Sequence, residues 1–269
     1  MLPLPQRVNS RTLARDLCSY YHPKRATFAV DSVGVYFFLT GMEHPLDNPI
    51  WQALSTGNKA LAIGDELAQV LPRDIGAFAG LAEYTPRAFA RLHELTIAGG
   101  PTVLFTAEPI QLPAGWRLLL HKELLQLVYP HSTVPSVEVG SVVALKERDV
   151  PAMLDLTALT NPGPFLARTI AFGQYHGIFQ DGQLVAMAGQ RLQPTPYTEI
   201  SAVCTHPAHL GRGYARQLVL HQIGLILAAG HLPFLHVNED NATAYALYLK
   251  LGFSLRRRLH VYVLEKQVE

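Results

Sequence analysis

The stretch Thr198-Glu-Ile-Ser-Ala-Val-Cys-Thr-His-Pro-Ala-His-Leu-Gly-Arg-Gly-Tyr-Ala215 decides the fold of this chain. It predicts an apolar strand that runs into a turn containing Gly211 and Gly213, and the turn opens a helix predicted from Tyr214 to Ala229. Glycine permits a tight turn, and the unpaired N–H groups at the start of a helix favour an anion. The stretch therefore indicates a diphosphate site, although two glycines alone are equally consistent with an ordinary helix start.

Composition excludes several classes of protein. The chain has 269 residues, of which 49% are apolar and 16% charged, so it is expected to fold around a core. The net charge is +1 and the longest basic run is Arg256–Arg258, which we expect on a solvated strand face, so no nucleic-acid partner is predicted. Apolar stretches such as Ile223–Ala229 are too short for a membrane span. The N-terminus does not resemble a secretory signal, and two cysteines fit a reducing compartment, so a cytoplasmic protein is expected.

The second half of the chain has a regular order of predicted elements. Asp181-Gly182 between two alternating apolar runs is a strong hairpin signal, and Gly230 and Gly252 stand where helix-terminating glycines belong. The predicted strands are 141–145, 177–180, 183–192, 199–205, 233–237 and 254–264, and the predicted helices are 148–160, 214–229 and 241–251.

The first half is less regular and carries no catalytic motif. Helices are predicted at 11–21, near Trp51 and at 87–98, and strands at 34–40, 102–106 and 116–120. Turn-forming residues at 134–140 suggest a boundary. We therefore expect an N-terminal α/β domain at 1–137 and a second domain at 138–269.

Two motifs in the second half resemble a known family. Gly211-Arg-Gly-Tyr-Ala215 follows the predicted strand 199–205, and Asn241-x-x-Ala244-x-x-Leu247-Tyr248-x-x-Leu251-Gly252-Phe253 follows the next strand. Together with the order of elements they resemble the GNAT superfamily of acyl-CoA-dependent N-acyltransferases. The runs 162–165, 186–189 and 199–207 are similar to a bacterial two-domain subgroup related to the glycine N-acyltransferase branch. The resemblance implies an α/β fold with a mixed, mostly antiparallel central sheet flanked by helices, and it leaves open whether the N-terminal half is a degenerate copy of that fold.

The resemblance implies acetyl-CoA as co-substrate and no metal. It also implies that strands 199–205 and 233–237 splay apart, so that the backbone of 203–205 pairs with the pantetheine arm. Ala208 and Leu210 depart from the family pattern, which places Gln or Arg at the first position and often a basic residue at the second, so binding is expected to rely on backbone N–H groups and two arginines. The predicted cofactor-binding residues are Val203, Cys204, Thr205, Leu210, Gly211, Arg212, Gly213, Tyr214, Ala215, Arg216 and Asn241.

Two residues are predicted to be catalytic. The resemblance places Tyr248 near the coenzyme A sulfur, where its hydroxyl can protonate the departing thiolate, and Glu199 where some members carry a general base. Each has a structural alternative: Tyr248 as a packing residue and Glu199 as a solvated strand end. Asn241 also suits a helix N-cap. Cys204 is interpreted as a small apolar filler rather than a nucleophile.

The histidines of the second half show no metal-ligand spacing. They are expected in surface or packing roles, and they are His206, His209, His221, His231 and His236.

The function predicted is transfer of an acetyl group from acetyl-CoA to a primary amine by direct attack in a ternary complex. A small amine, an amino acid or a protein N-terminus remains open as acceptor, and the oligomeric state is not predicted. Alternatives are an amino-acid N-acyltransferase that uses a longer acyl-CoA, a coenzyme-A-binding regulatory module without turnover, and an interaction protein with a vestigial turn.

Overall fold

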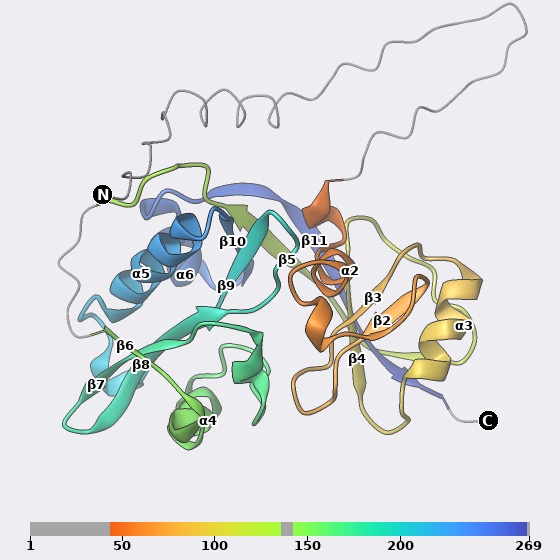
Figure 1. Ribbon diagram of the computed structural model, residues 1–269, viewed down its shortest axis with the longest axis horizontal. Helices are drawn as coiled ribbons and strands as arrows, with labels where there is room; N and C mark the ends of the chain where they lie inside the picture. The colour runs from red at the N-terminus through yellow and green to blue at the C-terminus, as the bar shows by residue number, and fades with distance from the viewer. Residues whose placement is uncertain (1–43, 136–141, 268–269) are drawn as a thin grey trace, which may run out of the picture. The chain divides into compact units, whose positions relative to one another are not determined.

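A computed structural model describes residues 44–135 and 142–267 (Figure 1). The helices in these ranges are α2 (Pro49–Ser55), α3 (Pro86–Leu95), α4 (Val150–Thr160), α5 (Tyr214–Ala228) and α6 (Ala242–Lys250). The strands are β1 (Ile63–Gly64), β2 (Ala68–Val70), β3 (Ala79–Leu81), β4 (Pro101–Thr106), β5 (Trp116–Val128), β6 (Val142–Ala144), β7 (His176–Gln180), β8 (Gln183–Gln190), β9 (Tyr197–Thr205), β10 (Leu232–Asn238) and β11 (Ser254–Lys266). The predicted helix 11–21, the predicted strand 34–40 and the predicted boundary at 137/138 lie outside the described residues.

The predicted elements from residue 148 onward are confirmed, each within two residues of its expected bounds. The hairpin turn at Asp181-Gly182 is present, and both of its residues have positive φ. Two differences lie earlier: the strands β1, β2 and β3 were not predicted, and the predicted strand 116–120 continues to Val128 as β5. Leu125 and Leu127 are fully or almost fully buried, so tertiary packing extends this strand beyond its local pattern.

One eight-stranded sheet dominates the fold. Its strand order is β4-β11-β5-β10-β9-β8-β7-β6, and only β9 and β10 run parallel. A small antiparallel sheet is formed by β1, β2 and β3. The mixed, mostly antiparallel sheet flanked by helices confirms the predicted fold class.

Strand β5 lies between the last two strands of the chain (Figure 1). It pairs antiparallel with β10 from Phe234↔Val128 to Asn238↔Leu124 and with β11 along its whole length. Strands from before residue 137 and from after it therefore share one sheet. The division at 137/138 stays a prediction, but it does not divide this sheet.

Helices cover both faces of the strands that carry the predicted site. Ile200 of β9 packs with Val219 of α5 and Tyr248 of α6 in one buried cluster. On the opposite face Cys204 packs with Met153 of α4. Residues four apart on a regular strand share a face, so an irregularity between Ile200 and Cys204 must turn the strand over.

The arginine run on β11 is not a solvated face, which corrects the prediction. Arg256 and Arg257 each bind the Asp47 carboxylate at 2.7 Å, and their side chains are only 18% and 28% exposed. A register shift between Leu255 and Arg257 breaks the strand alternation, so the two neighbouring arginines reach the same carboxylate. Arg258 is 52% exposed and pairs with Glu239.

Candidate functional site

The predicted anion-binding turn joins β9 to α5. Gly211 and Gly213 have φ of +76° and +78°, a left-handed conformation that favours glycine. Gly213 is the N-cap of α5 and supplies no capping side chain, so the first N–H groups of the helix keep their hydrogen-bonding capacity for a ligand. Nothing lies within 4 Å of the Cβ position of either glycine. The turn thus presents open backbone donors at the positive end of a helix dipole.

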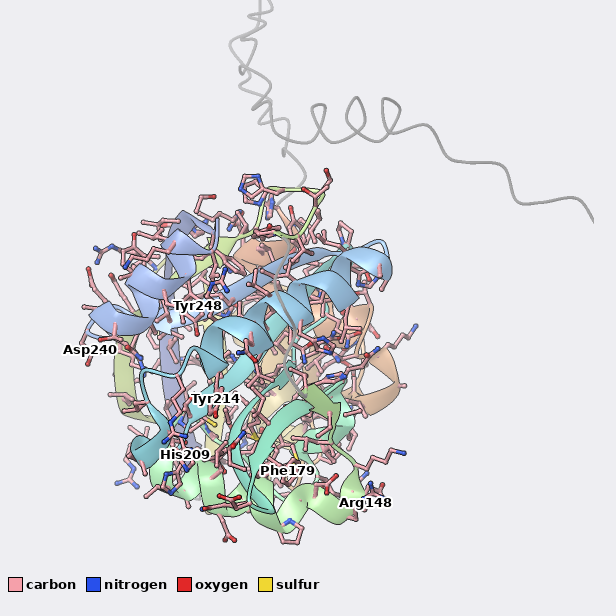
Figure 2. All side chains as sticks on the ribbon, turned by 90° about the vertical axis from the view of Figure 1, so that its left-hand side faces the viewer. Arg148, Phe179, His209, Tyr214, Asp240 and Tyr248 are labelled. Atoms are coloured by element: carbon pink, nitrogen blue, oxygen red, sulfur yellow. The ribbon has the colours of Figure 1, made fainter. Side chains whose placement is uncertain are left out.

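The side chains around this turn leave it open. Leu210 is 65% exposed, and Arg212 and Arg216 are exposed as well. Figure 2 shows Tyr214 at the start of α5, close to His209 on the approach to the turn. This arrangement fits the predicted reliance on backbone and arginine for anion binding.

Strands β9 and β10 separate beside the turn. They pair only at Leu232↔Tyr197, Pro233↔Thr198 and Phe234↔Glu199, so the β9 edge from residue 200 to 205 has no ladder partner in β10. An extended ligand can pair with backbone groups left in this way. The geometry agrees with the splay that the family resemblance implies.

A bulge in β9 places the residues that were predicted to bind the cofactor. The register with β8 passes from Gly189↔Ser201 to Met187↔Cys204, which adds one residue to β9, and Ala202 has φ of +53°. The bulge turns Cys204 to the face opposite Ile200 and breaks the regular backbone just before Val203. Strained backbone of this kind clusters at ligand sites.

An unsatisfied hydroxyl lies at the end of the same strand. The Thr205 Oγ1 atom is buried and has no hydrogen-bond partner among the described residues. Buried polar groups are almost always paired, so this atom has capacity for a ligand donor or acceptor.

Tyr248 is buried beside the separated strands, with 7% of its surface exposed. Its ring contacts that of Phe253 edge-on at 6.0 Å. Burial, with a smaller contribution from Cys204, raises the pKa of Tyr248 to about 12, so the hydroxyl keeps its proton at neutral pH.

Cys204 and Asn241 have structural roles in the described residues. Burial raises the pKa of the Cys204 thiol to about 11, which leaves almost no thiolate at neutral pH and agrees with the filler interpretation. The Asn241 Oδ1 atom accepts a hydrogen bond from Ala244 N–H at 3.1 Å, so Asn241 is the N-cap of α6. Its contact with the cofactor stays a prediction.

Glu199 is not a solvated strand end, which corrects that alternative. Its side chain is 1% exposed, and Arg191 binds it with two hydrogen bonds of 2.6 and 2.8 Å. Leu192 N–H donates a third, and His236 Nδ1 lies 2.7 Å from Glu199 Oε1. Burial opposes ionisation, but Arg191 and His236 outweigh it and lower the pKa of Glu199 to about 2. A carboxylate held this firmly is a weak base, so its direct catalytic role stays a prediction that this environment does not favour.

His236 is a site residue that the sequence did not single out. Arg256 donates to Gln126 Oε1, which directs the Gln126 amide N–H groups towards Leu46 O and His236 Nε2. His236 Nε2 therefore accepts, and its Nδ1–H donates to Glu199. The His236 side chain is 2% exposed, so of the surface and packing roles expected for the histidines only the packing role fits it. One signal in the sequence was available for the Glu199 ion pair. Arg191 and Glu199 carry opposite charges and stand on either side of the short connection between β8 and β9, which brings them together.

We predict that Glu199→Gln lowers the free energy of unfolding at neutral pH by about 3–5 kcal/mol, because it leaves the Arg191 charge buried without its partner. The folded pKa of about 2 lies below the ordinary 4.5, so the ionised carboxylate stabilises the fold above pH 4.5. That contribution disappears as the pH falls from 4.5 towards 2. Urea unfolding of both proteins across this range should show the difference narrowing with acid.

Glu239→Gln is the matched control for this change. Glu239 pairs with Arg258, but its side chain is 54% exposed, so its replacement should cost less than about 1 kcal/mol. Equal losses in the two variants would mean that the buried pair has no special role in stability.

Neither a metal site nor a membrane-spanning helix is found among the described residues. No group of three or more His, Cys, Asp and Glu side chains in these ranges has a geometry that could hold a metal ion. In the same ranges, each helix is too short or too polar to cross a bilayer.

Part of the chain is similar to known proteins. A family model described as FR47-like protein matches residues 175–263. The N-alpha-acetyltransferase RimI of Mycobacterium tuberculosis is 38% identical over 92 residues, which cover 32% of this chain and 57% of that protein. The chain thus spans a little over half the length of this curated relative.

Solved structures extend the likeness to most of the chain. A crystal structure from Novosphingobium aromaticivorans, described as a putative acetyltransferase from the GNAT family, is 37% identical with a TM-score of 0.78, and the match covers 84% of this chain and all of that one. A Drosophila protein matches with a TM-score of 0.54 at 14% identity over 74% of this chain and 73% of its own, which shows the fold alone. The Novosphingobium match covers more than residues 138–269 contain, so both halves share the likeness. This match shows that the chain belongs to the GNAT family of acyl-CoA-dependent N-acyltransferases, and the glycine turn and the separated strands agree with it.

Proposed function

We propose that this chain transfers an acetyl group from acetyl-CoA to a primary amine, with both substrates bound at once. The observation that carries the proposal is the pairing of two features: the open glycine turn at the start of α5 and the unpaired β9 edge beside it. One suits a diphosphate and the other an extended amide-containing arm.

The cofactor would bind mainly through backbone groups. Its diphosphate would accept hydrogen bonds from the first N–H groups of α5, with Arg212 and Arg216 adding positive charge. Its pantetheine arm would lie along residues 203–205, where the Thr205 hydroxyl offers a further hydrogen bond. The exposed Leu210 supplies no charge, so affinity depends on the turn itself.

The chemistry needs few side chains. The neutral amine attacks the thioester carbonyl carbon, a C–N bond forms and the C–S bond breaks, the new amide nitrogen gives up one proton, and the thiolate takes one. Tyr248 is our candidate for the donor of that proton. Its raised pKa supports this role, because it keeps the proton available over the physiological range.

The amine must lose a proton before it attacks. We propose that Glu199 acts as a positioning residue, which ties β9 to β10 by accepting the Nδ1–H of His236, rather than by taking the proton itself. The His236 ring is not the base in this arrangement, because its Nε2 atom already accepts a hydrogen bond from Gln126, so the amine proton passes to solvent. His236 lies two residues beyond Phe234, the last residue of β10 that pairs with β9, so it sits where the strands begin to part.

The name of one relative favours one class of acceptor group. The RimI protein is named as an N-alpha-acetyltransferase, which favours an α-amino group as acceptor here. A free amino acid, another small amine and a protein N-terminus are the candidate classes. Thiol release measured with each class, and with acetyl-CoA and longer acyl-CoAs, separates them.

We predict that Gly213→Ala weakens acetyl-CoA binding by about tenfold. The added Cβ has space, but alanine is strained at a φ of +78°. The start of α5 must therefore shift, and its N–H groups no longer point towards the diphosphate. Isothermal titration calorimetry with acetyl-CoA and with coenzyme A measures the effect.

Gly224→Ala, on the same helix, is the matched control. Its Cβ would meet only Val134 at 3.8 Å, an ordinary contact, so the variant should bind normally and gain up to about 1 kcal/mol in stability. Absence of binding in the unaltered protein would favour a vestigial turn. Binding without thiol release for any amine would favour a regulatory module.

A further inference from the structure

The buried clusters on the two faces of the sheet indicate where each substrate can approach. On one face, Leu235 of β10 packs with Tyr248 in a cluster that also contains residues of α5. The glycine turn opens α5, so the cofactor of the proposed function lies towards this face. Phe234 points to the opposite face and belongs to a separate cluster there. An amine that attacks the bound thioester must come from the face of Phe234, which we call the acceptor face.

Lys122 of β5 lies on the acceptor face. Leu124 is paired with Asn238 and packs against the cluster of Phe234, and Lys122 is two residues before Leu124 on the same strand. The Lys122 Nζ atom donates a hydrogen bond to Asn238 Oδ1 at 2.7 Å, and both residues are exposed. An ammonium group has three N–H donors, so Lys122 keeps capacity for a ligand.

Asn238 stands level with the segment of β9 that would hold the pantetheine arm. The parallel strands β9 and β10 last pair at Phe234↔Glu199. Asn238 comes four residues after Phe234, and Val203 comes four residues after Glu199. An arm that runs from the glycine turn back along β9 has its thioester at the Val203 end. The Lys122 ammonium group is therefore beside the gap between the strands, at the level of the reacting end of the cofactor.

Lys122 differs from the other cations near the acceptor face in its partner. Three arginines there are each bound to a carboxylate, and they are Arg191, Arg256 and Arg257. Lys122 makes no ion pair within the part of the chain that the structure describes, and its partner Asn238 is a neutral amide. The acceptor face thus carries a positive charge without a counter-charge beside the gap. Such a charge attracts a ligand carboxylate and hydrogen-bonds to it.

We propose that Lys122 binds the carboxylate of the acceptor and that the acceptor is a free α-amino acid, an inference that rests on the proposed function. An α-amino acid carries its amine and its carboxylate on one carbon, so the carboxylate lies close to the attacking nitrogen and within reach of Lys122. A protein N-terminus has a peptide bond in place of that carboxylate, and a polyamine has a second cation, so neither gains from Lys122. Strand β5 comes from the first half of the chain, which would in this way take part in acceptor recognition.

Thiol release from acetyl-CoA with L-alanine and with L-alaninamide tests the role of Lys122, because the amide replaces only the carboxylate. In Lys122→Gln, the ratio of kcat/KM for alanine to kcat/KM for alaninamide is expected to fall about tenfold, chiefly through the KM for alanine. Lys122→Arg should keep the ratio of the unaltered protein, because it keeps the charge. Lys146→Gln is the matched control and should keep it too, since Lys146 is an exposed residue that follows β6 at the far edge of the sheet.

Calorimetry gives a second readout that needs no turnover, and circular dichroism establishes that each variant is folded. Alanine titrated into the protein saturated with coenzyme A should bind about tenfold more weakly in Lys122→Gln than in the unaltered protein. If no amine releases thiol, the proposed function fails, and the alanine titration still decides the role of Lys122. A ratio and an alanine affinity that are both the same in Lys122→Gln as in the unaltered protein overturn that role and leave acetyl transfer standing.

Discussion

Residues 138–269 expressed alone are expected to lack a cooperative unfolding transition. The fragment would keep the glycine turn, Tyr248 and Glu199 but lose β5, which lies between β10 and β11. Leu125 and Leu127 of β5 belong to the core beneath α5 and α6, and each fully buried leucine contributes about 1.5–3 kcal/mol. The backbone edges of β10 and β11 that face β5 would also lose their hydrogen-bond partners. These losses are large beside the total stability of roughly 5–15 kcal/mol of a typical domain.

Circular dichroism and urea unfolding of the fragment measure this directly. Co-expression with residues 1–137 is the control, because the supplied strand should restore a cooperative transition. A fragment that unfolds cooperatively and binds acetyl-CoA alone would show that the GNAT half is an independent domain, as the boundary at 137/138 predicts.

Tyr248→Phe is expected to lower kcat by about 10²-fold or more while leaving the KM for acetyl-CoA nearly unchanged. The change removes only the hydroxyl, so the thiolate would leave without its proton donor, and general acid catalysis contributes about 10²–10⁴-fold. The ring keeps its contact with Phe253, so the fold should persist. Steady-state thiol release gives both constants, and thermal unfolding checks the fold.

Tyr245→Phe is the matched control on α6. Tyr245 packs against the same buried cluster, three residues before Tyr248, and carries no catalytic prediction. It should retain activity. Full turnover in Tyr248→Phe would leave Tyr248 as a packing residue.

The sequence predicted the local parts of the site well. Gly211, Gly213 and the start of α5 were visible because glycine placement and helix boundaries depend on a few neighbouring residues. The Asn241 cap was visible for the same reason. These features need no knowledge of the remainder of the chain.

The environment of Glu199 was not visible in this way. Its partners Arg191 and His236 lie 8 and 37 residues away, and Gln126, which faces His236 from the other side, comes from the first half. Only the sheet brings β8, β9, β10 and β5 into register, so no local pattern could show that the carboxylate is buried and ionised. The same holds for Arg256 and Arg257, because their partner Asp47 lies more than two hundred residues earlier in the chain.

By itself the sequence determined the order of elements after residue 148 and the glycine turn before α5, because these follow from short-range backbone preferences and apolar periodicity, and its motifs carried the resemblance to the family. Tertiary structure alone decided that β5 completes the sheet between β10 and β11, that the β9 bulge turns Cys204 away from the face of Ile200, and that Glu199 is enclosed by cationic and imidazole groups. Strand pairing joins residues far apart in the chain, and its partners are selected by complementary faces that local sequence does not encode.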